Sequence, residues 1–469
     1  MGSTLINPAT GESLARPADT PVAEVPAAVR RARAAFEEWG AAIPAERARV
    51  LLRFADLVEA DAEELTRLEV AETGKPAAVF RDGELPFAAD NLRFFAGAAR
   101  SLDGTGAGVF SAGYTSVMVR RPVGVVGSIA PWNFPLVMAV WKAGPALAAG
   151  NAVIVKPAPQ TPGTTLRLAE LFARAGAPDG LFQVVLGDGE VGQALVTDPG
   201  VDMVSVTGST ETGRAVMRGA AGSLKRVHLE LGGKAPALVF DDADLTAMAT
   251  GVAMGATYNT GQDCTAATRV YISRGVYDEA VDALRATLER VRPGDPWDPA
   301  SDIGPLISAG HRERVHGFVE RSRAYGASVL CGGVPGEGPG FYYPPTLIAG
   351  AGQRSEVVQG ELFGPVLVAL PFDGEDEAVR LANDVPYGLA SSVWSGDVAR
   401  ALRVSHRLDV GVTWVNDHLP IASEAPHGGV KGSGFGKDMS QEAVGEYSVT
   451  RHLMIKHQAP EVRDSFRPA

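Results

Sequence analysis

The sequence predicts an α/β fold with two doubly wound domains, each built on a parallel β-sheet. Short apolar strands alternate with helical stretches from residue 123 onward, which is typical of parallel strands joined by crossover helices. The same alternation starts again after Gly232-Gly233, which we take as a domain boundary. With 469 residues, the chain is long enough for two or three domains with separate cores.

The chain up to residue 100 is predicted to be mostly helical. A segment that begins at Pro44 places Val50 and Phe54 on one face. Asp61, followed by Glu64, predicts the N-cap and the capping carboxylate of the next helix. An amphipathic helix rich in Phe and Ala is predicted over 86–100.

The predicted strands form two series, one on each side of the Gly-Gly pair. The first series comprises residues 116–120, 123–130, 152–156, 182–186, 203–207 and 227–230, with helices over 164–175 and 189–197. The second comprises residues 237–240, 269–273, 366–370 and 412–416. Residues 135–155 approach a membrane-spanning length, but Lys142 and Pro145 interrupt them, so we predict a buried helix and then a buried strand.

Composition excludes several classes of protein. A net charge of −12 argues against nucleic acid or an anionic membrane as the main partner. The two cysteines, Cys264 and Cys331, cannot form a disulfide framework and fit a reducing compartment. The start of the chain lacks the basic and apolar segments of a signal peptide, so a cytoplasmic protein is expected. His311 and His316 would lie on different helix faces and no HExxH or CxxC motif occurs, so no metal site is expected.

Cys264 stands in the stretch Tyr258-Asn-Thr-Gly-Gln-Asp-Cys-Thr-Ala-Ala, among small and polar residues. A cysteine that only fills a core normally has apolar neighbours. This composition favours a turn that enters a helix, where a thiolate is stabilised by the helix N-terminus. A small buried residue near a helix start is the alternative, and the stretch alone does not decide between them.

Two glycine-rich segments follow predicted strands and open predicted helices. Gly187-Asp-Gly-Glu-Val-Gly192 matches the dinucleotide fingerprint GxGxxG, but no acidic residue stands cleanly about twenty positions later. An ordinary strand-to-helix turn explains it equally well. Gly208-Ser-Thr-Glu-Thr-Gly213 could hold a phosphate through backbone N–H groups and the Ser209 hydroxyl. It lacks the lysine of an ATP-binding P-loop, and a capped helix start is the alternative.

Two further residues stand at strand ends. Glu230 precedes Leu-Gly-Gly-Lys at the proposed domain boundary, where burial in a cleft would raise its pKa and suit a general base. A surface glutamate paired with Lys234 is the alternative. Asn133, in Pro-Trp-Asn-Phe-Pro, is a candidate oxyanion donor, although the same composition also suits a turn.

The order and spacing of these motifs resemble the aldehyde dehydrogenase superfamily. Six segments occur in the family's order: Pro131-Trp-Asn-Phe-Pro, Val-Lys156-Pro, Gly208-Ser-Thr-Glu-Thr-Gly, Glu230-Leu-Gly-Gly-Lys, Gly-Gln-Asp-Cys264 and Glu361-Leu-Phe-Gly-Pro. The resemblance extends from Asn7-Pro-Ala-Thr-Gly to Ser433-Gly-Phe-Gly. It implies an NAD-binding domain (1–103 and 123–232), a catalytic domain (233–440) and an oligomerisation element (104–122 and 441–469). In that element a hairpin over 114–122 would meet a strand near 449–455 in a homodimer or homotetramer.

The resemblance also implies roles for individual residues. Cys264 corresponds to the nucleophile, Glu230 to the general base, and Asn133 to the oxyanion donor together with the Cys264 N–H. Lys142 matches a lysine near the active site. The cofactor-binding positions are Trp132, Lys156 (adenosine ribose), Gly208, Ser209 (pyrophosphate), Gly213, Leu231, Glu361 (nicotinamide ribose) and Phe363. The segment from Gly187 to Gly192 is not the family's main phosphate site.

The implied reaction is oxidation of an aldehyde through a thiohemiacetal and a thioester on Cys264, followed by hydrolysis. Relatives that pass the thioester to coenzyme A typically lack a glutamate at the position of Glu230, so release of the free acid is expected here. NAD is the expected cofactor, but Pro159 stands where the family often has a glutamate that disfavours NADP, so NADP stays open. Two other functions are considered. A non-catalytic relative with a structural role is disfavoured because Cys264, Glu230 and Asn133 are intact. A Rossmann reductase that binds its cofactor through the Gly187 fingerprint would need no cysteine.

Several stretches resemble gamma-aminobutyraldehyde dehydrogenases within the superfamily: Ala89-Asp-Asn-Leu-Arg-Phe-Phe-Ala-Gly, Gly-Gln-Asp263-Cys-Thr-Ala, Glu424-Ala-Pro-His-Gly-Gly and Gly436-Lys-Asp-Met-Ser. The ammonium of 4-aminobutanal would suit an acidic, aromatic-lined tunnel. Asp263, with Asp90 or Glu424 farther out, could supply the charge. Asp263 capping the turn before Cys264 is the alternative. Betaine aldehyde or an aromatic aldehyde is the second substrate hypothesis.

Overall fold

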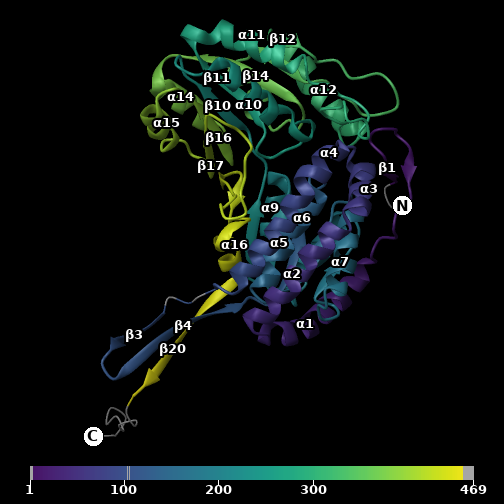
Figure 1. Ribbon diagram of the computed structural model, residues 1–469, viewed down its shortest axis with the longest axis vertical. Coiled ribbons are helices and arrows are strands. Elements are labelled where there is room, and N and C mark those ends of the chain that lie inside the picture. Colours follow the sequence, from purple (N-terminus) through teal and green to yellow (C-terminus); the bar gives the residue numbers. More distant parts are fainter. Residues whose placement is uncertain (1–3, 103, 105, 458–469) are drawn as a thin grey trace.

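Two α/β bodies and a projecting antiparallel arm make up the computed structural model, which describes residues 4–102, 104 and 106–457 (Figure 1). Helices α1 to α7 surround the first sheet, and α10 to α15 accompany the second, which is drawn at the top of the figure. Among the described helices, none combines the length and apolar character needed to cross a membrane.

The first sheet has the order β19-β9-β8-β5-β6-β7, with all neighbours parallel except β19. Its strands are β5 (Val125–Ile129), β6 (Ala152–Lys156), β7 (Phe182–Val184), β8 (Met203–Thr207), β9 (Arg226–Glu230) and β19 (Gly434–Phe435). Its helices are α1 (Val25–Ala41), α2 (Pro44–Ala60), α3 (Ala62–Thr73), α4 (Ala77–Val79), α5 (Leu85–Ala99), α6 (Pro135–Ala148), α7 (Gly163–Arg174), α8 (Gly189–Thr197) and α9 (Thr210–Ala221). A π-helical turn, η2 (Phe80–Glu84), joins α4 to α5.

The second sheet has the order β12-β13-β14-β11-β10-β16-β17, and only β12 is antiparallel to its neighbour. Its strands are β10 (Ala235–Val239), β11 (Ala267–Ser273), β12 (Ser328–Cys331), β13 (Thr346–Ala349), β14 (Val366–Phe372), β16 (Ala390–Trp394) and β17 (Val412–Val415). Its helices are α10 (Leu245–Thr257), α11 (Tyr277–Leu288), α12 (Ala309–Ala324), α13 (Glu356–Gln359), α14 (Gly374–Asn383) and α15 (Val398–Ser405). The 3-10 turns η3 (Tyr258–Gly261) and η4 (Arg274–Val276) flank β11.

The arm is a three-stranded antiparallel sheet, β3-β4-β20, that projects away from both bodies (Figure 1). Its strands are β3 (Gly106–Ser111), β4 (Tyr114–Pro122) and β20 (Ser448–Lys456), and α16 (Ser440–Glu446) leads into β20. Strand β20 pairs with β4 from Ser448 opposite Pro122 to Lys456 opposite Tyr114. The predicted pairing of these segments is therefore observed. Residues 458–469 of the predicted oligomerisation element, and residues 103 and 105, lie outside the described residues.

The two doubly wound sheets confirm the predicted fold class, and β6 and β8 have the predicted bounds. Residues 135–155 form the buried helix α6 followed by β6, as predicted. Strands β12, β13 and β16 were not predicted. Strand β16 contains Ser391 and Ser392, whose polarity obscures a buried strand. Ser392 is satisfied inside the sheet because its Oγ accepts from Trp394 Nε1 at 3.1 Å.

The predicted capping role of Asp61 is wrong. Helix α3 does begin after Asp61, but this side chain caps no backbone N–H. Its two carboxylate oxygens instead accept from Nε and Nη2 of Arg167, each at 2.6 Å. Glu64 pairs with Arg67 rather than reaching back to the helix start. A bidentate, charge-assisted pair to α7 outcompetes a single bond to a backbone N–H.

Candidate active site

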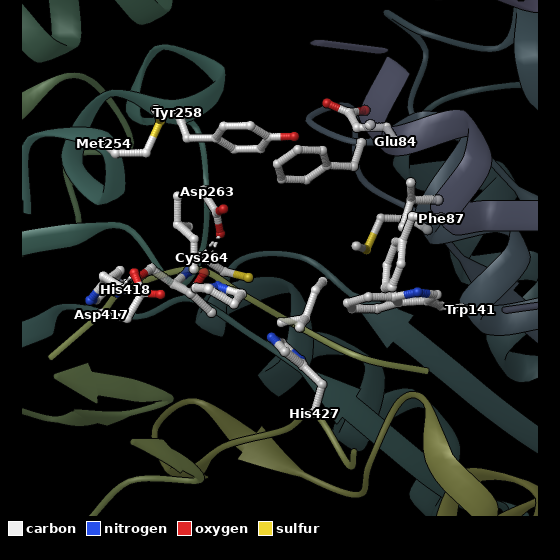
Figure 2. Close-up of a pocket in the computed structure, with 18 residues that line it drawn as sticks. Glu84, Phe87, Trp141, Met254, Tyr258, Asp263, Cys264, Asp417, His418 and His427 are labelled. Carbon is white, nitrogen blue, oxygen red and sulfur yellow. Dashed lines mark hydrogen bonds between the residues drawn. The ribbon is translucent and has the colours of Figure 1, made fainter. Parts of the chain in front are cut away.

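A cavity of about 470 Å³ lies between the two α/β bodies, and Cys264 is part of its wall. The first body contributes residues of η2, α5 and α6, including Phe87 and Trp141. The second contributes α10, η3 and the loop 417–421, including Tyr258. Figure 2 shows the Cys264 sulfur pointing toward this space, with aromatic rings around it. We call this space the aromatic cavity.

The chain reaches Cys264 through a left-handed turn. Asn259 and Thr260 have φ values of 48° and 57°, conformations that cost energy in residues with a side chain. Their side chains hold the turn: Asn259 Nδ2 donates to Gln262 O at 3.1 Å, and Thr260 Oγ1 donates to Gly304 O at 2.9 Å. Gly261 is also left-handed, and a Cβ there would lie 2.4 Å from the Gly364 carbonyl carbon.

The prediction that Cys264 enters a helix is wrong, because the turn leads into strand β11. The turn therefore supplies no helix N-terminus of its own to stabilise the thiolate, and the thiol depends on its other neighbours. Burial, together with the carboxylates of Asp263, Glu230 and Glu361, raises its pKa well above the usual range. A thiol in this setting needs a base or a bound cation to become nucleophilic.

Asp263 both lines the aromatic cavity and shapes the turn before the cysteine. Its Oδ1 accepts from the backbone N–H and the hydroxyl of Thr265, each at 2.8 Å. This is the capping arrangement that the sequence left open. Asp263 is also one of the residues that line the aromatic cavity, so the same side chain both caps the turn and forms part of the cavity wall.

Asn133 is held by both bodies beside Cys264. Its Nδ2 donates to Gln262 O at 3.1 Å, and its own carbonyl accepts from Asn259 Nδ2 at 2.9 Å and Lys75 Nζ at 3.0 Å. Asn133 and Cys264 line a second cavity of about 320 Å³. The amide is therefore oriented by a fixed network, as an oxyanion donor has to be.

Lys75 links this network to the aromatic cavity. Its fully buried ammonium donates to Glu84 Oε2 at 2.6 Å and lies 3.4 Å from Glu69 Oε1. Glu84 faces the aromatic cavity, and its burial raises its pKa to about 7. Sequence pattern alone does not single out Glu84, because a lone glutamate just before an amphipathic helix is usually solvated.

Lys75→Met is expected to destabilise the protein by about 3–5 kcal/mol, because it leaves two buried carboxylates without their cation. It is also expected to lower kcat through loss of the bond to Asn133 O. Urea unfolding and steady-state kinetics measure the two effects. Arg67→Met, which removes an exposed pair with Glu64, serves as the matched control and should cost about 0–1 kcal/mol. Equal stability of the two variants would contradict the prediction.

Glu230 is buried at the end of β9, which rules out the surface pair with Lys234. Burial and the nearby Asp438 carboxylate raise its pKa well above the usual range, while Lys142 and Lys437 oppose that shift. Lys234 is buried as well, and its Nζ has no hydrogen-bond partner among the described residues. Lys142 is fully buried and donates to both oxygens of Asp438, at 2.8 and 3.1 Å, so it lies beside Glu230 rather than in a cavity wall.

Four predicted cofactor positions, Trp132, Lys156, Gly208 and Ser209, line a third cavity of about 620 Å³, and all of them except Lys156 also line the second cavity. Lys156 Nζ donates to the carbonyls of Pro157 and Gly187, each at 2.9 Å, and burial lowers its pKa to about 8. Helix α9 begins here, with the neutral Ser209 hydroxyl accepting from Thr212 N at 3.1 Å.

The fingerprint from Gly187 to Gly192 reaches the same cavity but offers a poorer anion site. The Asp188 carboxylate accepts from Glu190 N at 3.0 Å and so covers the N-terminus of α8 with a negative charge. A phosphate there would meet that charge.

The remaining predicted cofactor residues lie around the second cavity. Glu361 Oε1 accepts from Gly233 N at 3.0 Å, and the rings of Trp132 and Phe363 are 5.2 Å apart. Gly213 packs against Leu231 so closely that a Cβ would lie 2.6 Å from a Leu231 methyl group. Leu231 lines this cavity, whereas Gly213 supports it from behind.

Two predicted substrate residues are not brought to the site. Asp90 and Glu424 are exposed and lie outside the set of described residues that line the aromatic cavity. Asp90 instead accepts from the Ser423 hydroxyl at 2.5 Å. The aromatic cavity is also lined by four polar residues that the sequence did not single out: Glu84, Asp417, His418 and His427. Across the described residues, no cluster of three or more His, Cys, Asp or Glu side chains could hold a metal ion.

The chain is similar to known proteins over nearly its whole length. The profile described as "Aldehyde dehydrogenase family" matches residues 3–453. A betaine aldehyde dehydrogenase of Cereibacter sphaeroides is 41% identical over 452 residues, which are 96% of this chain and 93% of that protein. One of Rhizobium etli is 42% identical over 452 residues, covering 96% and 92%. The betaine aldehyde dehydrogenase of Staphylococcus aureus in complex with NAD⁺ has a TM-score of 0.97 at 34% identity, covering 99% of this chain and 94% of that one.

The sequence match spans nearly the whole chain, and the fold agrees with that of the solved relative. The chain belongs to the aldehyde dehydrogenase family.

Proposed function

We propose that this aldehyde dehydrogenase uses NAD to oxidise a small cationic aldehyde, with betaine aldehyde as the preferred substrate, and releases the acid by hydrolysis. The observation that carries the proposal is the position of Cys264, which is in the walls of both the aromatic cavity and the second cavity. The aromatic cavity is suited to a substrate, and the second cavity is suited to a cofactor.

The residues of the second and third cavities fit a dinucleotide. The N-terminus of α9 is capped by a neutral hydroxyl and leaves its dipole available to a diphosphate. Lys156 has a third N–H beyond its two carbonyl bonds, which suits a ribose hydroxyl. When bound, NAD supplies the hydride acceptor. Pro159 lines the third cavity in place of an acidic residue, so NADP is the second cofactor candidate.

The chain's own residues would then carry the covalent chemistry. The Cys264 thiolate attacks the aldehyde carbon, and Asn133 Nδ2–H with the Cys264 N–H stabilises the oxyanion. Loss of hydride leaves a thioester on Cys264. Glu230 takes a proton from water as the new C–O bond forms, and the C–S bond breaks to release the acid and the thiolate.

The aromatic cavity favours a cation. Trp141 lies between Phe87, with ring centroids 6.3 Å apart, and His427, at 5.1 Å. Phe134 stacks on Tyr258 at 6.1 Å, and Asp263 and Asp417 add negative charge to the wall. A trimethylammonium group has no N–H to satisfy and is stabilised by ring faces and nearby carboxylates. The named relatives are betaine aldehyde dehydrogenases. The ammonium of 4-aminobutanal, the second candidate, needs hydrogen-bond acceptors as well as charge.

Betaine aldehyde is expected to show a kcat/KM at least about tenfold above that of 3,3-dimethylbutanal, its uncharged isostere. Asp263→Asn keeps an oxygen to cap Thr265 but removes the charge, so it should reduce this ratio while leaving the isostere's kcat/KM unchanged. An NADH absorbance assay with betaine aldehyde, 4-aminobutanal and the isostere measures the ratios. Equal values for charged and uncharged aldehydes would contradict the proposed substrate class.

The arm supports the further proposal of a cytoplasmic homo-oligomer. Val109 and Phe110 are 67% and 71% exposed at its tip, and Met454 and Ile455 on β20 are also exposed. Apolar side chains on a projecting sheet are suited to packing against another copy of the chain. Both cysteines are free, which fits a reducing compartment.

A further inference from the structure

His427 is a buried side chain that connects the aromatic cavity to Glu230. The ring is part of the cavity wall, and its Nδ1 lies 3.5 Å from Glu230 Oε2. Figure 2 shows the ring below Cys264, directed into the cavity. Its Nδ1 and Glu230 Oε1 are both buried and have no hydrogen-bond partner among the described residues.

The position of the His427 ring is fixed from two sides. Trp141 packs against it, with centroids 5.1 Å apart. The backbone of His427 exchanges two hydrogen bonds with Asp438, at 2.8 and 2.7 Å, and Asp438 is itself tied to Lys142. The following residue, Gly428, lies close to the glutamate, because a Cβ added there would be 2.6 Å from Glu230 Oε1. The ring and the carboxyl group therefore have little freedom to separate.

We propose that His427 is the positioning residue of the general base: its Nδ1–H donates to Glu230 Oε2 and holds the carboxylate toward the Cys264 thioester. This inference rests on the proposed role of Glu230. A separation of 3.5 Å is at the outer limit of a hydrogen bond, and catalytic contacts of this kind often shorten when substrate is bound.

The need for such a donor follows from the surroundings of Glu230. Burial and Asp438 raise the pKa of Glu230, which favours the protonated form that cannot act as a base. The groups that face the pair are Lys142, Asp438, Lys437, Glu446 and Asp263. Lys142 is already bound to Asp438, so it offers charge at a distance rather than a hydrogen bond. Burial also lowers the pKa of His427, which keeps the ring neutral, with one N–H to donate.

Two variants of His427 separate a positioning role from simple packing. His427→Phe keeps an aromatic ring against Trp141 but removes the donor. His427→Asn keeps a donor near the position of Nδ1 and cannot titrate. His406→Asn, on the exposed surface at the end of α15, is the matched control and should retain the activity of the parent enzyme.

The experiment combines rapid-mixing measurement of NADH formation with kcat across pH. In His427→Phe we expect kcat to fall about 10- to 100-fold, which is the loss of one hydrogen bond to a charged group. The first turnover should keep its rate, so a burst of one NADH per site appears. The acidic limb of the kcat–pH profile should move to higher pH, because Glu230 loses a donor that favours its charged form. His427→Asn should recover most of kcat and the original pH limb.

Three outcomes would overturn the inference: an unchanged pH limb in His427→Phe, a first turnover slowed as much as kcat, or no recovery in His427→Asn. Glu230→Gln, measured in parallel, separates this inference from the proposed function. If Glu230→Gln accumulates an acyl-enzyme and His427→Phe does not, the positioning role alone fails. If Glu230→Gln turns over normally, the assignment of the base fails first.

Discussion

Cys264→Ala is expected to abolish NADH formation from every aldehyde while the fold is retained. The thiol is in the walls of the two cavities proposed for substrate and cofactor, so its removal leaves no atom to form the covalent intermediate. Alanine fits the same space without strain because the left-handed residues of the turn, Asn259 and Thr260, precede this position. An absorbance assay and a thermal unfolding curve measure the two parts of the prediction.

Cys331→Ala is the matched control. Cys331 is half-buried at the end of β12, outside the residues that line the aromatic cavity, and its replacement should leave kcat unchanged. Iodoacetamide provides a second readout. Burial and three carboxylates raise the pKa of Cys264, so its alkylation should accelerate as pH rises and show no plateau near neutrality. Residual turnover in Cys264→Ala would contradict the role of Cys264 as nucleophile, and fast alkylation at pH 6 would contradict its raised pKa.

Most strands of the first sheet were within reach of the sequence, because buried parallel strands are short apolar runs. Strands β6 and β8 are of this kind. Strand β16 was missed because Ser391 and Ser392 interrupt the apolar pattern. Their hydroxyls are satisfied by Thr413, Trp394 and His418, partners that only the folded chain brings near.

The environment of Cys264 was not predictable from its neighbours. Small polar residues before a helix and before a strand look alike, and the left-handed conformations of Asn259 and Thr260 depend on distant contacts. Thr260 bonds to Gly304, and Asn259 bonds to Asn133. Tertiary structure also decides the positions of Asp90 and Glu424. Both carry the negative charge expected near the substrate, but both lie on the exposed surface.

Glu84 and His427 show what the sequence could not reveal about the site. A π-helical turn ends at Glu84, before α5, and Glu84 lies against Lys75, whose second partner is the carbonyl of Asn133. His427 is 197 residues from Glu230, so their contact is a property of the tertiary structure. Motif order singled out the candidate reactive groups, whereas their supporting residues required the fold.

Glu230→Gln is expected to stop the reaction after the first hydride transfer. The amide occupies the volume of the carboxyl group but cannot accept a proton from water, so the thioester on Cys264 is no longer hydrolysed. NADH should form in a burst of one equivalent per active site, followed by turnover slowed by about 10²- to 10⁴-fold. Intact-protein mass spectrometry should detect the acyl group on Cys264, and hydroxylamine should release it.

The pH dependence of thioester hydrolysis also tests the role of Glu230 as the general base. Because the pKa of Glu230 is raised, the carboxylate is lost as pH falls through that raised value, and hydrolysis by the parent enzyme should decline on the acidic side. Glu230→Gln should lack this limb. Since Glu230 also raises the pKa of Cys264, the variant should alkylate faster at a given pH. Glu442→Gln, an exposed change in the first turn of α16, should alter none of these. Normal steady-state turnover in Glu230→Gln would place the base elsewhere in the cavity.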